Sequence, residues 1–254
     1  MSTIRLLHTI YTIFLFAVSV AVLFPFFVVF GFKAKWHHLA YKLDHLWATV
    51  YFPLCFFKTE VIFKGKRPEN GPVIYCANHF STIDIPSMAL LPKQACYVGK
   101  TSISKLPLFG YMFKTLHITV DRASFRDKGR AYQKYNKAIN QGKSLFIFPE
   151  GGINSLQIPE QSKYKVGAFK LAIEHKIPIV PVSIPHNWKI LPDGDWLIKG
   201  NKIKLIVHEP VETKHLGADD VQKLKFKVRE IIQTSINAEN GIELNRVGST
   251  SCVM

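Results

Sequence analysis

The feature that most constrains the fold of this chain is a long uncharged stretch near its start. Residues 6–32 contain no Lys, Arg, Asp or Glu. As a helix, these 27 residues would reach roughly 40 Å, against a hydrocarbon core of about 30 Å. A secretory signal peptide is a poor interpretation, because the run is too long, only Arg5 precedes it as a basic flank, and no clean small-residue cleavage site follows. The sequence therefore predicts a membrane-anchoring helix, in which Pro25 can produce a kink or a shallow turn.

A second apolar segment, residues 46–57, follows a basic linker. The two segments could form one membrane span plus an interfacial helix, or a pair of helices that dips into one leaflet. Basic residues accumulate after the first segment, which predicts that the downstream domain faces the cytoplasm. These residues are Lys33, Lys35, Lys42, Lys58, Lys64, Lys66 and Arg67.

From Lys58 onwards, short β-rich runs alternate with helical stretches. The expected strands are Glu60–Phe63, Val73–Cys76, Cys96–Val98, His117–Val120, Leu145–Phe148, Ile179–Ser183 and Ile203–His208. The expected helices are Asp127–Gln141, Lys165–His175 and a segment that opens at Asp219-Asp220. This alternation predicts an α/β fold with a mixed, mainly parallel sheet flanked by helices. We expect a membrane-anchoring helical element in residues 1–57, a folded domain in 58–240 and a disordered tail in 241–254.

A histidine and an aspartate five positions apart follow the apolar run 72–77, where a buried strand would end. A neutral imidazole at His79 can remove a proton from an alcohol near neutral pH, and Asp84 can fix its tautomer and stabilise the imidazolium. Residues five apart diverge by about 140° on a helix, so a turn is expected between them, with a helix starting at Asp84. The alternative role is a hydrogen bond that only ties loop to helix. Chance would place such a pair in roughly one chain in three, and the pair His215 and Asp220 is interpreted as solvated loop.

Five further blocks follow the first pair in a fixed order. They are Val98-Gly99-Lys100, Leu106-Pro107-Leu108-Phe109-Gly110, Thr119-Val120-Asp121-Arg122, Phe148-Pro149-Glu150-Gly151 and Ile179-Val180-Pro181-Val182-Ser183. Together with the Asn-His-x4-Asp pattern of residues 78–84, they resemble the blocks of the 1-acylglycerol-3-phosphate acyltransferase (lysophosphatidate acyltransferase) family. The resemblance runs from about Pro72 to Pro185. It implies a glycerolipid acyltransferase-like fold, an N-terminal two-helix membrane element, an acyl-CoA or acyl-carrier-protein donor, and a lysophospholipid acceptor.

The resemblance also suggests residues that bind the substrates. It implies that Lys100 and Arg122 face the phosphate of the acceptor, because phosphate oxygens need charged donors. A turn at Gly151 can present backbone N–H groups to an anion, and Glu150 is expected to position the free hydroxyls of the acceptor. The alternatives are ordinary surface cations and a plain turn at a strand end. Since the sequence contains no G-x-S-x-G elbow, we expect direct transfer without an acyl-enzyme.

The chain departs from the family pattern directly after Gly151. The family continues with Thr-Arg, whereas this chain has Gly152-Ile153 and lacks a cation expected at the phosphate. Lys163 or Lys165 could reach the same space. Alternatively, the acceptor carries no phosphomonoester, as in a lyso-aminolipid.

Composition limits the class of partner. The net charge of +15 and the pI of about 9.6 require acidic neighbours, and both nucleic acid and anionic lipid qualify. Nothing resembles a zinc finger or an RNA-binding signature, so no nucleic-acid partner is expected. The histidines lack metal-ligand spacing, and neither a metal nor a cofactor is expected. The leading hypothesis is a membrane acyltransferase that acylates the sn-2 hydroxyl of 1-acylglycerol 3-phosphate to phosphatidic acid. The non-enzymatic alternative is a basic, membrane-tethered lipid-binding protein.

Overall fold

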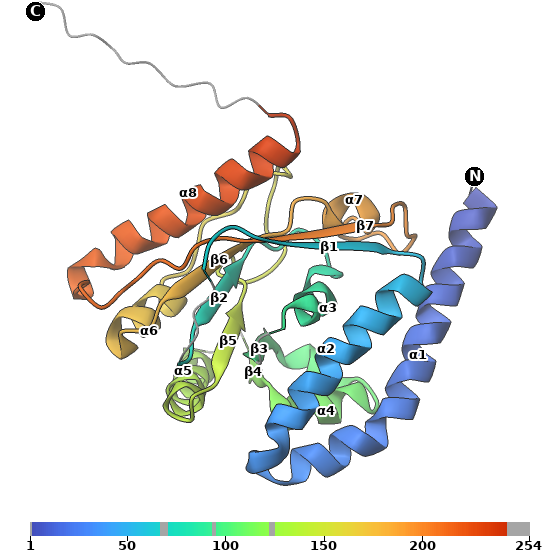
Figure 1. The fold of residues 1–254 in the computed structure, drawn as a ribbon, viewed down its shortest axis with the longest axis horizontal. Coiled ribbons are helices and arrows are strands. Elements are labelled where there is room, and N and C mark those ends of the chain that lie inside the picture. Colours follow the sequence, from blue (N-terminus) through green and yellow to red (C-terminus); the bar gives the residue numbers. More distant parts are fainter. Residues whose placement is uncertain (1, 67–70, 93–94, 122–124, 243–254) are drawn as a thin grey trace, which may run out of the picture.

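A helix pair precedes an α/β domain in this protein. The computed structural model of the 254-residue chain describes residues 2–66, 71–92, 95–121 and 125–242. The pair consists of α1 (Ser2–Phe32) and α2 (His37–Leu54), joined by a short 3-10 turn, Ala34–Trp36. Figure 1 shows the pair packed at one end of the sheet, on the far side of the molecule from α8 (Val221–Glu239).

Seven strands form the sheet. They are β1 (Lys58–Phe63), β2 (Ile74–Ala77), β3 (Ala95–Lys100), β4 (Ile118–Val120), β5 (Ser144–Ile147), β6 (Ile179–Ser183) and β7 (Lys202–Val207). Their order is β1-β7-β6-β2-β5-β3-β4. The neighbours from β6 to β4 run parallel, while β7 pairs antiparallel with β6 and parallel with β1. The sheet is therefore mixed and mainly parallel, as predicted, and the carboxyl ends of β2, β5, β3 and β4 meet at one edge, where ligands of such sheets bind.

The core lies on both faces of this sheet. Along β2, Ile74 and Cys76 belong to the apolar layer that α6 (Gly167–His175) and α8 cover, whereas Tyr75 and Ala77 belong to the layer that contains α2. A strand buried on both faces has an apolar sequence throughout, which explains why the run at 72–77 was readable as a strand.

The remaining helices are α3 (Asp84–Ser87), α4 (Phe109–Leu116), α5 (Phe125–Asn140) and α7 (Asn187–Ile190), with 3-10 turns at Met88–Leu90, Thr101–Lys105 and Ala218–Asp220. All expected strands and helices are present with small shifts at their ends. The sequence did not reveal α4, whose Met112, Phe113 and Leu116 are buried. Gly110 lets this helix approach the preceding turn, since a Cβ there would lie 2.5 Å from the carbonyl oxygen of Ser104.

The N-terminal helices differ from the expectation in two respects. The helix α1 continues through Pro25 as one element, and its ribbon curves in Figure 1 before the turn into α2. The helix α2 begins at His37, upstream of the apolar segment 46–57, because Ala40 and Tyr41 already pack into the core. Within the described chain, Thr3–Phe32 is a helix long and apolar enough to cross a membrane.

Candidate active site

The loop after β2 carries the histidine–aspartate pair, and the residue before it fixes the loop to the sheet. Asn78 is fully buried. Its side chain donates to the carbonyl of Ile184 (2.9 Å) and accepts the N–H of the same residue (2.7 Å). This exchange continues the β2–β6 pairing by one more rung, so His79 leaves the sheet from a defined position. Sequence reasoning missed this role, although Asn78 directly precedes His79.

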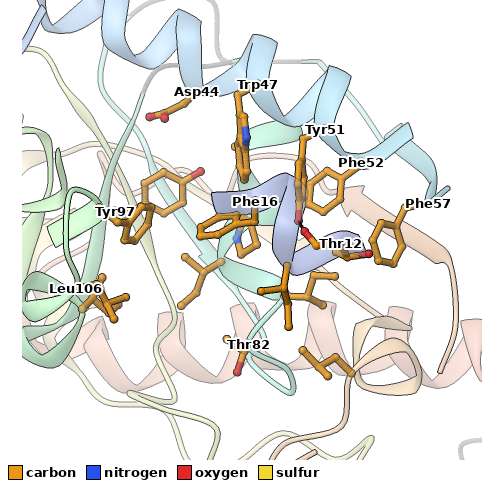
Figure 2. A pocket seen from close by; sticks show the side chains of 18 of the residues that line it. Thr12, Phe16, Asp44, Trp47, Tyr51, Phe52, Phe57, Thr82, Tyr97 and Leu106 are labelled. Atoms are coloured by element: carbon orange, nitrogen blue, oxygen red, sulfur yellow. Dashed lines mark hydrogen bonds between the residues drawn. The ribbon is translucent and has the colours of Figure 1, made fainter. Parts of the chain in front are cut away.

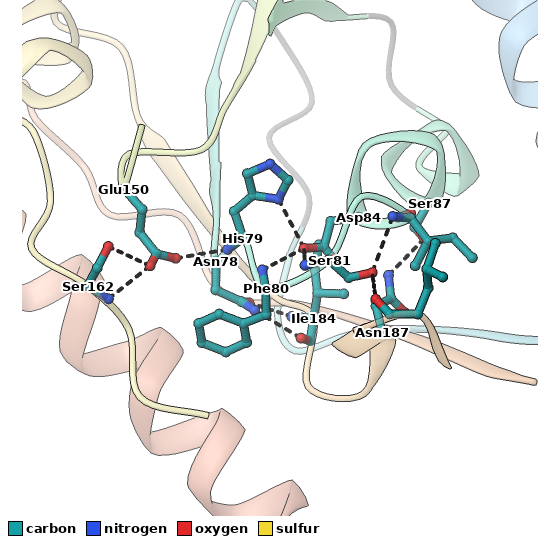
Figure 3. Close-up of polar contacts among 12 residues, drawn as sticks. Asn78, His79, Phe80, Ser81, Asp84, Ser87, Glu150, Ser162, Ile184 and Asn187 are labelled. Atoms are coloured by element: carbon teal, nitrogen blue, oxygen red, sulfur yellow. Dashed lines mark hydrogen bonds and ion pairs between the residues drawn. The ribbon is translucent and has the colours of Figure 1, made fainter. Parts of the chain in front are cut away.

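The imidazole of His79 contacts a fully buried carboxylate. Its Nδ1 lies 3.1 Å from Oδ2 of Asp84, and the same oxygen accepts the N–H groups of Phe80 and Ser81 at 2.8 Å each (Figure 3). Oδ1 of Asp84 has no hydrogen-bond partner within the described ranges. Because Asp84 accepts the Nδ1–H, the lone pair of His79 is on Nε2. The predicted turn and the predicted contact are therefore both present, while the catalytic role of the pair stays a prediction.

The loop after β5 holds His79 from the other side. The ring of Phe148 stacks on the imidazole, with centroids 4.3 Å apart and an interplanar angle of 23°. Oε1 of Glu150 accepts the backbone N–H of His79 (2.8 Å), and Oε2 accepts both the N–H and the hydroxyl of Ser162 (2.8 Å each). Burial raises the pKa of Glu150, and these hydrogen bonds counteract only part of that increase. The sequence did not predict these contacts of Phe148 and Ser162, because each contact joins segments that lie far apart along the chain.

The structure shows which groups Glu150 contacts. Sequence reasoning placed this carboxylate against the hydroxyls of the acceptor. In the structure Glu150 is 1% exposed, and both of its oxygens are hydrogen-bonded inside the protein. One of these partners is the backbone N–H of His79, which Glu150 holds in place, whereas contact with the hydroxyls of the acceptor stays a prediction.

The turn at Gly151 brings a cation to the site. Gly151 has a φ of +77°, and a Cβ at this position would lie 2.5 Å from Nζ of Lys165. The Lys165 side chain therefore lies directly over the turn that follows Glu150. This is the space in which the family pattern has an arginine and in which this chain has Gly152-Ile153.

The other two predicted cations lie at the ends of neighbouring strands. Lys100 is exposed at the end of β3, where it pairs in register with Val120 of β4. Arg122 follows β4 and lies outside the described residues. Lys100 ends a strand that runs parallel to β2 and β5, so it lies at the same edge of the sheet as His79, while the contact of either cation with a phosphate stays a prediction.

Two cavities adjoin the pair. The apolar cavity, of about 440 Å³, is lined by side chains of α1, α2 and α4 and by Thr82 and Ile83 from the turn between His79 and Asp84 (Figure 2). The Lys165 cavity, of about 290 Å³, is lined by residues of β3, β4, β5, α5 and α6, including Phe148. Volumes of this size suit small ligands. His79 thus has a neighbour in the wall of each cavity.

The structure also describes the second histidine–aspartate pair and the side chains that could bind a metal. Asp220 accepts the N–H of Gly217 at 2.9 Å, and His215 is exposed in the preceding turn, as expected for solvated loop. Across the ranges the structure describes, no group of three or more His, Cys, Asp or Glu side chains is placed to hold a metal ion.

A family of known proteins matches the part of the chain that carries this edge of the sheet. The family model described as Acyltransferase matches residues 58–185, from the start of β1 to just beyond β6. This chain belongs to the acyltransferase family. The match covers the sheet strands β1 to β6 together with every described residue that the preceding paragraphs place around His79 except those of α1 and α2.

Relatives and a solved structure agree with this membership. A chloroplastic 1-acyl-sn-glycerol-3-phosphate acyltransferase of Brassica napus is 27% identical over 192 residues, which cover 74% of this chain and 54% of the relative. A probable 1-acyl-sn-glycerol-3-phosphate acyltransferase of Mycoplasma pneumoniae is 31% identical over 186 residues, covering 66% of this chain and 69% of the relative. The chain spans about half the length of the chloroplastic relatives it matches. The crystal structure of the 1-acyl-sn-glycerophosphate acyltransferase PlsC of Thermotoga maritima superposes with a TM-score of 0.79 over 97% of this chain and 100% of that chain, at 23% identity, and shows that the two share a fold.

Proposed function

We propose that this protein transfers a fatty acyl group from an acyl thioester to the free sn-2 hydroxyl of 1-acylglycerol 3-phosphate, giving phosphatidic acid for phospholipid synthesis. The observation that carries the proposal is the buried contact between His79 and Asp84, with Thr82 of the same turn in the wall of the apolar cavity and Phe148, which stacks on His79, in the wall of the Lys165 cavity. The named relatives are 1-acyl-sn-glycerol-3-phosphate acyltransferases, which supports the same acceptor.

The chemistry assigns one proton to His79. Nε2 removes the proton of the acceptor hydroxyl as its oxygen attacks the thioester carbonyl, and Asp84 stabilises the imidazolium that forms. The C–S bond then breaks, and the departing thiolate takes the proton back from Nε2. The acyl group ends as an ester and the donor as a thiol. Asp84 remains ionised throughout, held by the N–H groups of Phe80 and Ser81.

In the proposed mechanism, each of the two cavities binds one of the two substrates. In this proposal the acyl chain of the donor lies in the apolar cavity, whose wall includes Thr82 beside His79. The glycerol phosphate of the acceptor lies at the opposite side, with Lys165, Lys100 and Arg122 around its phosphate. Lys165 then supplies the charge that Gly152-Ile153 do not.

The apolar face of the N-terminal helices fits a lipid surface. Exposed large apolar side chains recur along α1 and α2, in the loop before α4 and in α4 itself. They are Ile4, Leu7, Ile10, Tyr11, Ile13, Phe14, Val18, Val22, Phe26, Val29, Phe32, Leu46, Val50, Leu54, Phe56, Leu106, Leu108 and Tyr111. So many exposed apolar side chains are unusual on a soluble surface and are typical of membrane contact. We propose that residues 1–57 anchor the domain 58–240 to one leaflet, on its cytoplasmic face.

A matched pair of histidine variants tests the proposal. His79→Ala should reduce turnover to background while the protein still folds and associates with membranes, whereas His215→Ala, at an exposed loop, should keep wild-type turnover. The purified protein is offered lysolipids with acyl-CoA or acyl-carrier-protein donors, and products are weighed by mass spectrometry. Substantial product from His79→Ala would remove the assigned base. Salt-sensitive binding to anionic vesicles without any covalent product would instead favour a lipid-binding protein.

A second acceptor is kept because of one sequence feature. Ile153 replaces the arginine of the family pattern, and a lysine over Gly151 is a weaker bidentate partner for a phosphate than arginine. The second hypothesis is therefore a lysolipid without a phosphomonoester, such as a lyso-aminolipid. Exclusive use of lysophosphatidate in the same panel would eliminate it.

A further inference from the structure

The apolar cavity has one polar area on its wall. Asp44 of α2, Tyr97 of β3 and His117, which precedes β4, line it together with apolar side chains. The Asp44 side chain is 20% exposed, and its Oδ2 is buried without a hydrogen-bond partner in the described chain. Tyr97 is 9% exposed, and its side chain also lines the cavity. Polar atoms without partners are rare in buried positions, so this area calls for an explanation.

His117 and Asp44 lie near each other but are not hydrogen-bonded. Nδ1 of His117 accepts the backbone N–H of Tyr97 at 3.3 Å, so the ring proton is on Nε2. Nε2 lies 3.9 Å from Oδ2 of Asp44, which is too far for a hydrogen bond. Burial lowers the pKa of His117 to about 3 and raises the pKa of Asp44 to about 7. At a separation of 3.9 Å the two groups form no direct hydrogen bond, so each can bond to a polar group placed between them.

The polar area lies away from the reacting end of the cavity. Figure 2 shows Asp44 on the α2 side, across the cavity from Thr82 beside the His79–Asp84 pair. Asp44 also borders a second, smaller cavity of about 40 Å³, together with Phe16, Trp47 and Phe109, which line both cavities. A chain that enters beside Thr82 and extends through the cavity towards α2 therefore reaches Asp44.

We infer that Asp44, His117 and Tyr97 form a subsite for a hydroxyl group on the acyl chain, so that the protein prefers hydroxylated acyl donors over plain donors of equal length. The inference rests on the proposed function. A hydroxyl both donates and accepts, so one oxygen placed between the two groups accepts from Nε2–H of His117 and donates to Oδ2 of Asp44. A methylene at the same place leaves both polar atoms without partners and cut off from water.

The test compares donors that differ by one oxygen. A series of long-chain acyl thioesters with the hydroxyl at successive positions is matched with plain thioesters of the same length, and kcat/KM is measured for each. We expect at least one hydroxy isomer to exceed its plain counterpart by about tenfold. Asp44→Leu should reduce this ratio to about one, and Tyr97→Phe, which removes only a hydroxyl, should reduce it several-fold. Thr12→Val removes another unpaired hydroxyl from the same cavity and should leave the ratio unchanged.

The outcomes separate this inference from the function on which it rests. Equal kcat/KM for all hydroxy and plain donors would show that water occupies the subsite and would overturn the inference while leaving the function intact. A preference that survives Asp44→Leu, or that disappears with Thr12→Val, would place the hydroxyl elsewhere. If no donor gives product, displacement of a fluorescent fatty acid from the cavity by hydroxy and plain fatty acids decides the same question. The hydroxy acid should then compete about tenfold better, and only in proteins that keep Asp44.

Discussion

Replacement of Asp84 by Asn separates the charge of this carboxylate from its shape. Oδ2 accepts three N–H groups, from His79 Nδ1, Phe80 and Ser81, whereas Oδ1 has no partner in the described chain. The Asn side chain must therefore place its carbonyl oxygen at the Oδ2 position and its NH2 group at the Oδ1 position. The tautomer of His79 is retained, and the negative charge is lost.

The size of the effect follows from the short contact. Two unit charges about 4 Å apart attract by about 4 kcal/mol at an effective dielectric constant of about 20. The positive charge on His79 develops only in part at the transition state, so we take about 2 to 3 kcal/mol, which is roughly 30- to 150-fold in kcat. KM should change little, because His79 carries no charge before proton transfer. The buried NH2 without an acceptor should reduce the free energy of unfolding by about 1 to 3 kcal/mol.

Steady-state kinetics with lysophospholipid in mixed micelles, together with Tm, measure these quantities. Asp84→Leu is the matched variant, since it removes the charge and the acceptor together and should be as inactive as His79→Ala. If Asp84→Asn keeps more than a third of the wild-type kcat, the carboxylate does not stabilise an imidazolium. If the Asn and Leu variants are equally inactive, the argument that the three N–H groups preserve the tautomer is refuted.

Three further expectations follow from buried contacts. Glu150→Gln replaces one accepting oxygen by an NH2 group, which then faces an N–H donor instead of accepting from it. We expect kcat to fall by about tenfold, because the backbone of His79 shifts, and the free energy of unfolding to fall by about 1 to 3 kcal/mol. Unchanged kinetics would refute the positioning role. Asn78→Ala loses both hydrogen bonds to Ile184 and should cost about 2 to 4 kcal/mol in denaturant unfolding, a prediction that a loss under 1 kcal/mol contradicts. Burial lowers the pKa of His208 to about 4, so between about pH 6.5 and 4 the unfolded chain binds a proton there that the folded protein does not. The free energy of unfolding should therefore fall as the pH is lowered through this range, by at most about 1.4 kcal/mol per pH unit. A pH profile of Tm that is the same for His208→Asn would exclude this origin.

The sequence revealed the sheet because its strands are apolar runs between turn signals. All seven expected strands are present, and so is the turn that brings His79 and Asp84 together. The helix α4 was missed because Pro107 and Gly110 make its start look like a loop, and only the tertiary packing of Phe113 and Leu116 makes it a helix. Local pattern carries no information about such packing.

The same limit applies to the candidate site. The position of Glu150 after a strand was readable, but its burial against Ser162 depends on a segment that local pattern could not place. Lys165 was one of two lysines expected near this turn, and its position over Gly151 depends on a side-chain path that local pattern does not give. Residue type and order therefore predicted which residues gather at the sheet edge, while the direction of each side chain required the fold.

The helices α1 and α2 supply a wall of the apolar cavity as well as the face proposed to touch lipid. Under the proposed function, anchorage and recognition of the fatty chain are both encoded in one piece of sequence, outside the segment that the family model matches. Exchange of this hairpin between relatives should transfer part of the chain-length preference while leaving the proton-transfer machinery in place. Removing α1 and α2 to gain solubility would open the apolar cavity to water.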